Sequence, residues 1–491
     1  MEASIREAPI QLEEKYELVI GLEVHAQLST QTKLFCGDSA SFGGAPNTHI
    51  SPITLAYPGT LPRLNKEAMV AAVKMGLACG CRITETNWFA RKHYFYPDLP
   101  KGYQTSQHIN NICQGGEVRI QVNGQERAVK LHHIHLEEDA GKSIHDAHPE
   151  KTAIDHNRAG VPLIEIVSEP DLYSAEEAYA YVTEIRKLVR FLGICDGNME
   201  EGSMRCDANI SIRPRGEKKL GTKVEVKNLN SIRNVKRAIE IEAQRMMEMA
   251  ERGETIQQQT RSFDAERMIT FSLRSKEEAN DYRYFPDPDL PPFVISAAQL
   301  ESIRSGMPEL PDAIQQRYMK DYQLPAYDAR LLSDEKELVH YFEATIQFTK
   351  QYKAVANWIL GPIKAWLNEN NLNIDQFKLE PSQLARLVEL VHSGKISFSS
   401  ASSRLFPRLL EQPFADPVTL ATSLQLLQDA GEDQIEQWVA EVLSKMPEKV
   451  AEYKKGKKGL IGLFMGEVKK VSKGKADPKT TTAVLEQKLN Q

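Results

Sequence analysis

The residues best suited to chemistry begin in a short alternating stretch near the N-terminus. In ELVIGLEVHAQLS, every second residue from Leu18 to Leu28 is apolar, and Glu23, His25 and Gln27 lie between them. Side chains alternate across a strand, so the carboxylate and the imidazole, two residues apart, point the same way. Such a pair can share one divalent cation. A surface strand with a polar outer face is the alternative.

Three consecutive acids follow a second, histidine-rich strand. The segment LHHIHLEEDAGKS contains Glu137, Glu138 and Asp139, and adjacent carboxylates repel one another unless a cation or solvent intervenes. The Gly-Lys-Ser turn that follows is not a P-loop, because that pattern requires glycine where this chain has Leu136. Lys142 of this turn is a candidate to neutralise a phosphate as a point charge. Solvated loop acids are the alternative.

Polar residues also interrupt three later strands. Glu165 lies between Ile164 and Ile166, where a carboxylate is costly unless it is paired or binds metal; an ion pair with Arg158 is the alternative. Two further strands have polar faces that suit a nucleotide or acyl-phosphate site. Their polar residues are Arg205, Asp207 and Asn209 in the first strand, and Glu225 and Lys227 in the second, with Asn228 following.

The pattern of the chain changes near residue 295. Before it, alternating strands are separated by Gly, Pro and Asn turns, with helical periodicity at 65–79 and 174–192. This mixture predicts an α+β domain with helices on a largely antiparallel sheet. Four prolines within residues 281–293 favour an extended segment that closes it. We therefore expect an α+β domain over 1–294, an all-helical domain over 295–412 and a small, helical, basic tail domain over 413–491.

Composition excludes several classes of protein. The 491 residues exceed one hydrophobic core, and no apolar run approaches the roughly 18 residues of a membrane span. The first residues have neither a signal core nor a transit-peptide composition. Six cysteines form no disulfide framework, and no HExxH or Gly-x-Ser-x-Gly motif supports a zinc hydrolase or serine amidase. We expect a cytoplasmic protein without membrane association.

Charge is concentrated near the C-terminus. Between Lys454 and Lys479 there are nine lysines and two acids, in a chain whose formal net charge is −6. A basic end on an acidic body favours local contact with a polyanion. A solvated helical surface is the alternative.

Seven motifs, in order along the chain, are similar to those of one family. They are GLEVHAQL (21–28), RKHYFYPDLPKGYQTSQ (91–107), EEDAGKS (137–143), NRAGVPLIEIVSEPD (157–171), EEGSMRCDANISIRP (200–214), EVKNLNS (225–231) and DYRYFPDPDLPP (281–292). Together they resemble the B subunit of the glutamine-dependent aspartyl/glutamyl-tRNA amidotransferase. The helical remainder and the basic tail also fit that family.

The resemblance implies a ligase that forms carbon–nitrogen bonds with glutamine as the amide donor. The 1–294 domain would bind the acceptor end of misacylated Glu-tRNA(Gln) or Asp-tRNA(Asn). With ATP and Mg²⁺ it would phosphorylate the side-chain carboxylate, which ammonia then converts to the amide. An amidase A subunit would supply the ammonia and a small C subunit would complete a heterotrimer. A non-catalytic tRNA-binding scaffold and a stand-alone metal-dependent hydrolase are the alternatives.

The resemblance also implies roles for individual residues. The Mg²⁺ ligands and catalytic residues would be Glu23, His25, Glu138 and Glu165, with Glu137 possible in place of Glu138. Nucleotide or acyl-end contacts would be Lys142, Asp207, Asn209, Glu225, Lys227 and Asn228. Contacts to tRNA, with the steep salt dependence typical of phosphate binding, would be Lys454, Lys455, Lys457, Lys458, Lys469, Lys470 and Lys473.

One loop departs from the family pattern. Many members carry four cysteines near the N-terminus, an arrangement suited to structural zinc. This chain keeps Cys36 and has Asp38, Ser51 and Thr54 at the other three positions. One thiolate does not hold a structural zinc, so we expect no zinc and a loop held by packing.

Overall fold

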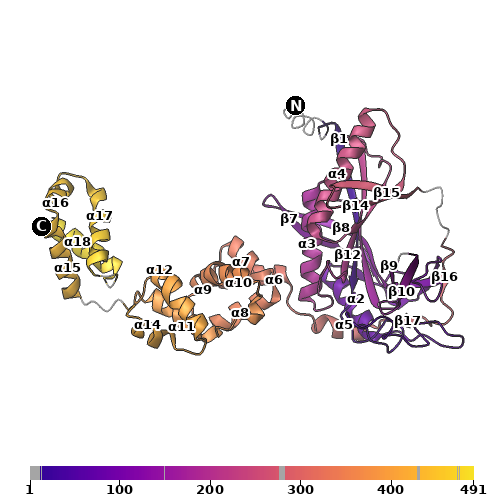
Figure 1. Cartoon of the computed structure of the whole chain (residues 1–491), viewed down its shortest axis with the longest axis horizontal. Helices are drawn as coiled ribbons and strands as arrows, with labels where there is room; N and C mark the ends of the chain where they lie inside the picture. Colours follow the sequence, from indigo (N-terminus) through magenta and orange to yellow (C-terminus); the bar gives the residue numbers. More distant parts are fainter. Residues whose placement is uncertain are drawn as a thin grey trace. The chain divides into compact units, whose positions relative to one another are not determined.

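The computed structural model describes residues 12–490 except for 13, 149, 276–281, 428–431, 473 and 475. The chain forms two compact units, divided between Leu310 and Pro311 (Figure 1). Among the described residues, no helix has the length and apolar character needed to cross a membrane.

A ten-stranded sheet organises the first unit. Its order is β15-β14-β13-β12-β1-β11-β8-β6-β2, with β7 paired to β8. Only β13 and β14 pair in parallel among these described strands, so the predicted α+β fold on a largely antiparallel sheet is confirmed. The strands are β1 (Tyr16–Gln27), β2 (Arg82–Ile83), β6 (Cys113–Gln114), β7 (Glu117–Val122), β8 (Gln125–Glu138), β11 (Pro162–Ser168), β12 (Met204–Pro214), β13 (Val224–Leu229), β14 (Gln259–Asp264) and β15 (Ile269–Ser275).

Helices cover one face of this sheet (Figure 1). They are α2 (Lys66–Ala78), α3 (Ala175–Phe191) and α4 (Ile232–Glu251). Each begins after a residue whose side chain accepts a backbone N–H, which satisfies one of the free donors of the first turn; these residues are Asn65, Ser174 and Ser231. The apolar positions of β1 face these helices, and Ile20, Leu22 and Val24 are fully buried. Burial of each such side chain contributes about 1.5–3 kcal/mol.

Smaller strands lie outside the large sheet. The hairpin β9 (Lys142–His148) and β10 (Lys151–Asp155) forms one pair, and β4 (Ala90–His93) forms a three-stranded sheet with β5 (Tyr103–Ser106) and β16 (Phe285–Pro286). The proline-rich segment supplies β16 and β17 (Phe293–Val294), which pairs with β3 (Thr86–Asn87). Helix α5 (Ala297–Ser305) then contacts α2. The first unit therefore continues past residue 294, as far as Leu310.

The described part of the second unit is helical, as predicted. Its α-helices are α6 (Pro311–Asp321), α7 (Ala326–Ser333), α8 (Lys336–Ile346), α9 (Tyr352–Trp358), α10 (Lys364–Asn370), α11 (Pro381–His392), α12 (Phe398–Ser400), α13 (Phe406–Glu411), α14 (Pro417–Ser423), α15 (Glu432–Lys445), α16 (Pro447–Lys454), α17 (Ile461–Val471) and α18 (Pro478–Asn490). The last four share their own apolar core, which includes Val439, Phe464 and Leu485.

Candidate active site

Strand register brings the polar residues of five strands onto the face opposite the helices. Glu23 on β1 lies opposite Asp207 on β12, and His25 lies opposite Glu165 on β11. Residues paired in this way point to the same face of a sheet. The apolar residues that alternate with them on β1 pack against the helices, so the polar side chains lie on the opposite face of the sheet.

The first cluster consists of His25, Glu137 and Glu165, whose ligand atoms all lie within 4.8 Å of one another. His25 Nε2 is 3.2 Å from Glu165 Oε2 and 3.9 Å from Glu137 Oε1. His135 Nε2 lies 3.4 Å from Glu137 and 3.5 Å from Glu165. The set of one imidazole nitrogen and several carboxylate oxygens, all partly or fully buried, suits a divalent cation.

The second cluster consists of Glu23, Asp207 and Glu225, again with ligand atoms within 4.8 Å of one another. Lys227 Nζ lies 2.7 Å from Asp207 and 3.1 Å from Glu225. Asn209 donates a hydrogen bond of 2.8 Å to Glu23 Oε1. One ammonium faces three carboxylates here, so negative charge remains for a bound cation to balance.

The pKa values reflect this crowding of charge. Burial lowers the pKa of His25, but the carboxylates of Glu165 and Glu137 outweigh it and raise that pKa to about 9. Burial, and then the charge of Glu165, raises the pKa of Glu23. Burial would raise the pKa of Glu165 as well, but the neighbouring His25 and His135 lower it. The carboxylates of the two clusters therefore stabilise a positive charge that lies among them.

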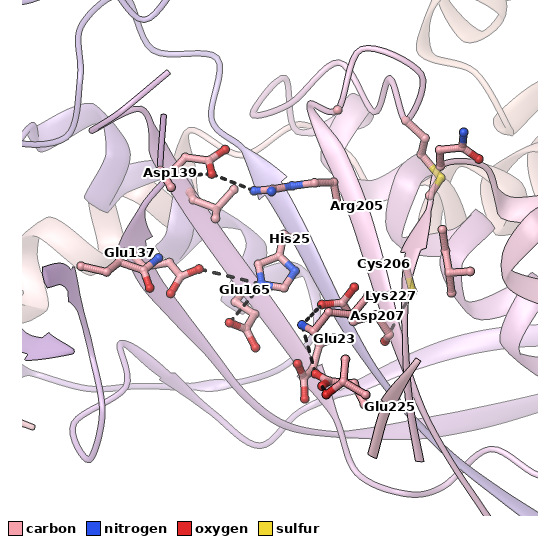
Figure 2. Close-up of a pocket in the computed structure, with 18 of the residues that line it drawn as sticks. Glu23, His25, Glu137, Asp139, Glu165, Arg205, Cys206, Asp207, Glu225 and Lys227 are labelled. Carbon is pink, nitrogen blue, oxygen red and sulfur yellow. Dashed lines mark hydrogen bonds and ion pairs between the residues drawn. The ribbon is translucent and has the colours of Figure 1, made fainter. Parts of the chain in front are cut away.

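Both clusters line one cavity of about 900 Å³ (Figure 2). This volume lies near the upper end of the range for small-molecule sites. Its lining includes Glu23, His25, Lys92, Glu137, Asp139, Glu165, Arg205, Asp207, Glu225, Lys227 and Thr260.

Asp139 has a different environment from the two clusters. Its carboxylate lies 3.0 Å from Arg205 and 3.7 Å from Arg158, and it accepts a 2.7 Å hydrogen bond from Gln27. Burial would raise the pKa of Asp139, but the two arginines lower it. Arg158 thus pairs with Asp139, whereas Glu165 lies with the two histidines.

Glu138 points away from the clusters, contrary to our preference for it over Glu137. Its carboxylate forms an ion pair with Lys101 and accepts a 2.8 Å hydrogen bond from the Thr105 backbone N–H. It lines a second cavity, of about 330 Å³. Alternation explains the reversal, because His135 and Glu137 share a face of β8 and the next residue points to the other face. Glu137, not Glu138, joins the first cluster.

The Gly-Lys-Ser turn lies outside the cavity lining. Lys142 begins β9 with an exposed side chain. Packing accounts for the glycine at position 141, since a Cβ there would lie 2.8 Å from the carbonyl oxygen of Asp155. Asn228 is on β13, but its side chain is not among those that the structure describes. Lys473 lies outside the described residues.

The other predicted tRNA contacts are exposed lysines of the four-helix tail. They are Lys454, Lys455, Lys457, Lys458, Lys469 and Lys470. Two of them pair with acids of the tail itself: Lys457 lies 3.0 Å from Glu452 and Lys470 lies 2.5 Å from Glu467. The two lysine side chains are 71% and 73% exposed, so these pairs contribute little to stability and leave the lysines accessible to a polyanion.

Sequence reasoning missed His135, which contacts two carboxylates of the first cluster, and Lys92, which lines the cavity. His135 could have been found, because it alternates with Glu137 on β8 in the way that His25 alternates with Glu23. Lys92 comes from β4 in the separate three-stranded sheet. Its position depends on tertiary packing, for which spacing along the chain gives no signal.

The thiol of Cys36 lies in a network of side-chain hydrogen bonds. The Cys36 thiol lies 3.3 Å from Asp38 Oδ2 and 3.4 Å from the Thr54 hydroxyl, which itself donates to Asp38. Burial raises the pKa of the thiol. These hydrogen bonds between side chains hold the loop.

Two family models match the chain. The GatB/GatE catalytic domain matches residues 18–301, which include every described residue of both carboxylate clusters, and the GatB domain matches residues 340–489. The first match alone spans more than half of the sequence. The chain belongs to the GatB family.

Relatives that match this chain over nearly their whole length share one name within this family. Proteins named as the B subunit of aspartyl/glutamyl-tRNA(Asn/Gln) amidotransferase match from Thermodesulfovibrio yellowstonii (46% identical over 96% of this chain and 98% of the relative) and Chlorobium chlorochromatii (47% over 96% and 99%). A third, from Dichelobacter nodosus, is 48% identical over 97% of this chain and 99% of its own length. The resemblance to B subunits predicted from the seven motifs is confirmed.

Proposed function

We propose that this chain is the carboxylate-activating subunit of a tRNA-dependent amidotransferase. ATP would phosphorylate the side-chain carboxylate of Glu-tRNA(Gln) or Asp-tRNA(Asn), and ammonia would displace the phosphate to leave the amide. A carboxylate is a poor electrophile, and the acyl phosphate provides a good leaving group. The observation that carries the proposal is the pair of carboxylate clusters on one sheet face, within one cavity.

The residues present fit Mg²⁺. Carboxylate oxygens are the ligands it prefers, and the first cluster, His25, Glu137 and Glu165, would hold one ion, with Glu23, Asp207 and Glu225 available to a second. Bound there, Mg²⁺ would offset the repulsion between the phosphates and the carboxylate that attacks them.

The protein's own cations would orient the two anionic substrates. Lys227 projects from β13 into the cavity beside the second cluster, where it can bind a phosphoryl oxygen as a point charge. Lys92 and Arg205 line the same cavity. Arg205 is fixed by Asp139 at 3.0 Å, which holds its guanidinium in place for an acyl or phosphate oxygen.

The proposal requires partners. We propose an amidase A subunit as the source of ammonia from glutamine, a small C subunit that completes a heterotrimer, and a cytoplasmic location with the tRNA pool. The exposed tail lysines would contact the tRNA backbone.

The direct test is phosphate release from ATP by the complex, with ammonium in place of glutamine and with or without misacylated tRNA. We expect turnover that requires the misacylated tRNA and yields amidated product. Glu23→Gln should reduce this turnover by about 100-fold or more, the scale seen when one group that stabilises charge in the transition state is removed. Glu17→Gln, on the same strand but paired with Arg213 outside the cavity, is the matched control.

The alternative is a tRNA-binding scaffold whose acids are structural. In that case turnover would survive Glu23→Gln, or would proceed at the same rate without tRNA. Either result would remove the phosphoryl-transfer step from this chain.

A further inference from the structure

His135 lies beside the first cluster without lining the cavity. Its Nε2 atom is 3.4 Å from Glu137 Oε2 and 3.5 Å from Glu165 Oε2, so one ring nitrogen faces both carboxylates. The side chain of His135 is only 9% exposed, and His135 is not among the described residues that line the cavity. A substrate in the cavity would therefore meet the two carboxylates and not this imidazole.

The position of His135 follows from strand alternation and register. His133, His135 and Glu137 alternate along β8 and so share one face of this strand. His135 is also paired with Glu165 on the neighbouring strand β11, and paired residues point to the same face of a sheet. The imidazole therefore lies next to one carboxylate on its own strand and next to another on the adjacent strand.

Each of the two carboxylates contacts two imidazoles. Glu137 Oε2 contacts His135 and accepts a 3.3 Å hydrogen bond from the Ser106 hydroxyl. The other oxygen of Glu137, Oε1, faces His25 at 3.9 Å. Glu165 Oε2 lies 3.2 Å from His25 and 3.5 Å from His135, and Figure 2 shows both carboxylates pointing to His25. His135 and Ser106 therefore hold one oxygen of Glu137 and leave the other for a cation beside His25.

The second ring nitrogen of His135 is held as well. Its Nδ1 atom lies 3.0 Å from Nε2 of His133, and the centroids of the two rings are 5.1 Å apart. Burial, together with the neighbouring His135 and His132, lowers the pKa of His133 to about 3, so this ring is neutral near pH 7. A neutral imidazole has one N–H and one lone pair, so His133 can donate to Nδ1 of His135 or accept from it. The hydrogen bond therefore persists whether or not His135 itself is protonated.

The chemistry of the partners fixes a proton on the cluster side of His135. Ionised carboxylates can only accept hydrogen bonds, so the nitrogen that faces Glu137 and Glu165 must donate. Two carboxylates this close repel each other when no cation lies between them. An N–H directed at both offsets that repulsion and keeps the carboxylates in place. Groups that hydrogen-bond to metal ligands in this way orient those ligands and contribute about 10–100-fold to metal affinity.

We propose that His135 is a positioning residue. It holds the carboxylates of Glu137 and Glu165 in the orientation that binds a divalent cation, and His133 fixes its imidazole in turn. The inference rests on the proposed function, because the ion concerned is the Mg²⁺ of phosphoryl transfer. His135 contributes to the affinity of the first cluster for that ion and is not itself a ligand.

The test is Mn²⁺ binding to the assembled complex, measured by electron paramagnetic resonance of free Mn²⁺. His135→Leu removes the donor, and we expect Mn²⁺ affinity to fall about tenfold or more. His135→Gln keeps an N–H at the position of Nε2 and should retain most of the affinity. His133→Leu should cause a smaller loss, because it removes only the outer hydrogen bond.

Ile134→Val is the matched control. Ile134 is fully buried on the other face of the same strand. This variant should lower the thermal midpoint, because it deletes a buried methyl group, and should leave Mn²⁺ affinity unchanged.

Electron spin echo spectroscopy separates positioning from ligation, because it detects the nitrogen of an imidazole that is bound to Mn²⁺. The nitrogen coupling from His25 should be the same in wild type and in His135→Gln. A coupling that is lost in His135→Gln would make His135 a ligand and overturn the inference.

Three results of the Mn²⁺ titrations would also overturn the inference. They are unchanged affinity in His135→Leu, an equal loss in His135→Gln and His135→Leu, and an equal loss in Ile134→Val. If His135→Leu does not fold, His133→Leu decides the question, since unchanged affinity there would contradict the fixed imidazole. Failure of the proposed function looks different: Mn²⁺ affinity would still depend on His135, but the wild-type complex would show no tRNA-dependent ATP turnover.

Discussion

Lys227 Nζ lies 2.7 Å from Asp207 Oδ2, on the cavity face of two adjacent strands. The ammonium is partly buried and also reaches Glu225 at 3.1 Å. Burial would lower the pKa of Lys227, but the two carboxylates raise it. The lysine thus stays charged and partly balances the second cluster in the absence of a divalent cation.

Removal of that ammonium should increase the dependence of the fold on divalent cations. In Lys227→Met, Glu23, Asp207 and Glu225 would repel one another, and we expect a lower thermal midpoint without Mg²⁺ and a larger rise on its addition than in the wild type. Differential scanning fluorimetry with and without Mg²⁺ measures both. Lys236→Met, on α4 outside the cavity, is the control. An identical Mg²⁺ response in wild type and Lys227→Met would contradict the proposed second cation position.

Glu137 and Glu138 are adjacent in sequence but should differ in metal binding. Glu137→Gln removes a carboxylate of the first cluster, and we expect Mn²⁺ affinity to fall about tenfold or more. Glu138→Gln should leave Mn²⁺ affinity unchanged, because its carboxylate binds Lys101 and the Thr105 N–H instead. Electron paramagnetic resonance of free Mn²⁺ gives both affinities. The reverse order would place the metal on the other side of β8.

The helical tail should contribute to tRNA affinity through its lysines. Helix α14 contacts α11, whereas α15–α18 share a core of their own, so a chain ending at Leu427 removes the four-helix tail alone. We expect tRNA affinity to fall severalfold or more at physiological salt, with a shallower dependence on salt concentration. Filter binding over a salt series measures both quantities. Wild-type affinity and slope in the truncated chain would remove the tail from tRNA recognition.

The loop at Cys36 should depend on Asp38 rather than on zinc. Burial would raise the pKa of Asp38, but hydrogen bonds from Thr54, Ser51 and Cys36 lower it below its ordinary value. The stability that it contributes is therefore present above the ordinary aspartate pKa of about 3.9 and is lost as pH falls through the lowered value.

Asp38→Asn should accordingly speed proteolysis of this loop at neutral pH, and the difference from wild type should shrink as the pH falls through the lowered pKa of Asp38. Metal analysis of chelator-treated, repurified protein should find no stoichiometric zinc. One zinc per chain, or a pH-independent difference between the two proteins, would mean that the loop is held in another way.

The alternation of apolar and polar residues was the most reliable guide to the strands that carry the site. It placed Glu23 and His25 on one face of β1 and Glu165 within a strand, because alternation is a local property of the backbone. The pairing of these two strands came from the structure. Alternation did not decide between Glu137 and Glu138 at the end of β8. It also did not predict that Lys92 lines the cavity, because this residue comes from a different sheet.

The two faces of β1 have a shared consequence for folding. Its apolar residues build the core and its polar residues build the cavity, so both depend on a single pairing register with β11 and β12. A slip of one residue would turn Glu23 and His25 toward the helices and expose Ile20 and Val24. The register that buries the apolar side chains of β1 therefore also aligns the carboxylates of the cavity. A chain with a misaligned site would lack its hydrophobic core and would not be stable.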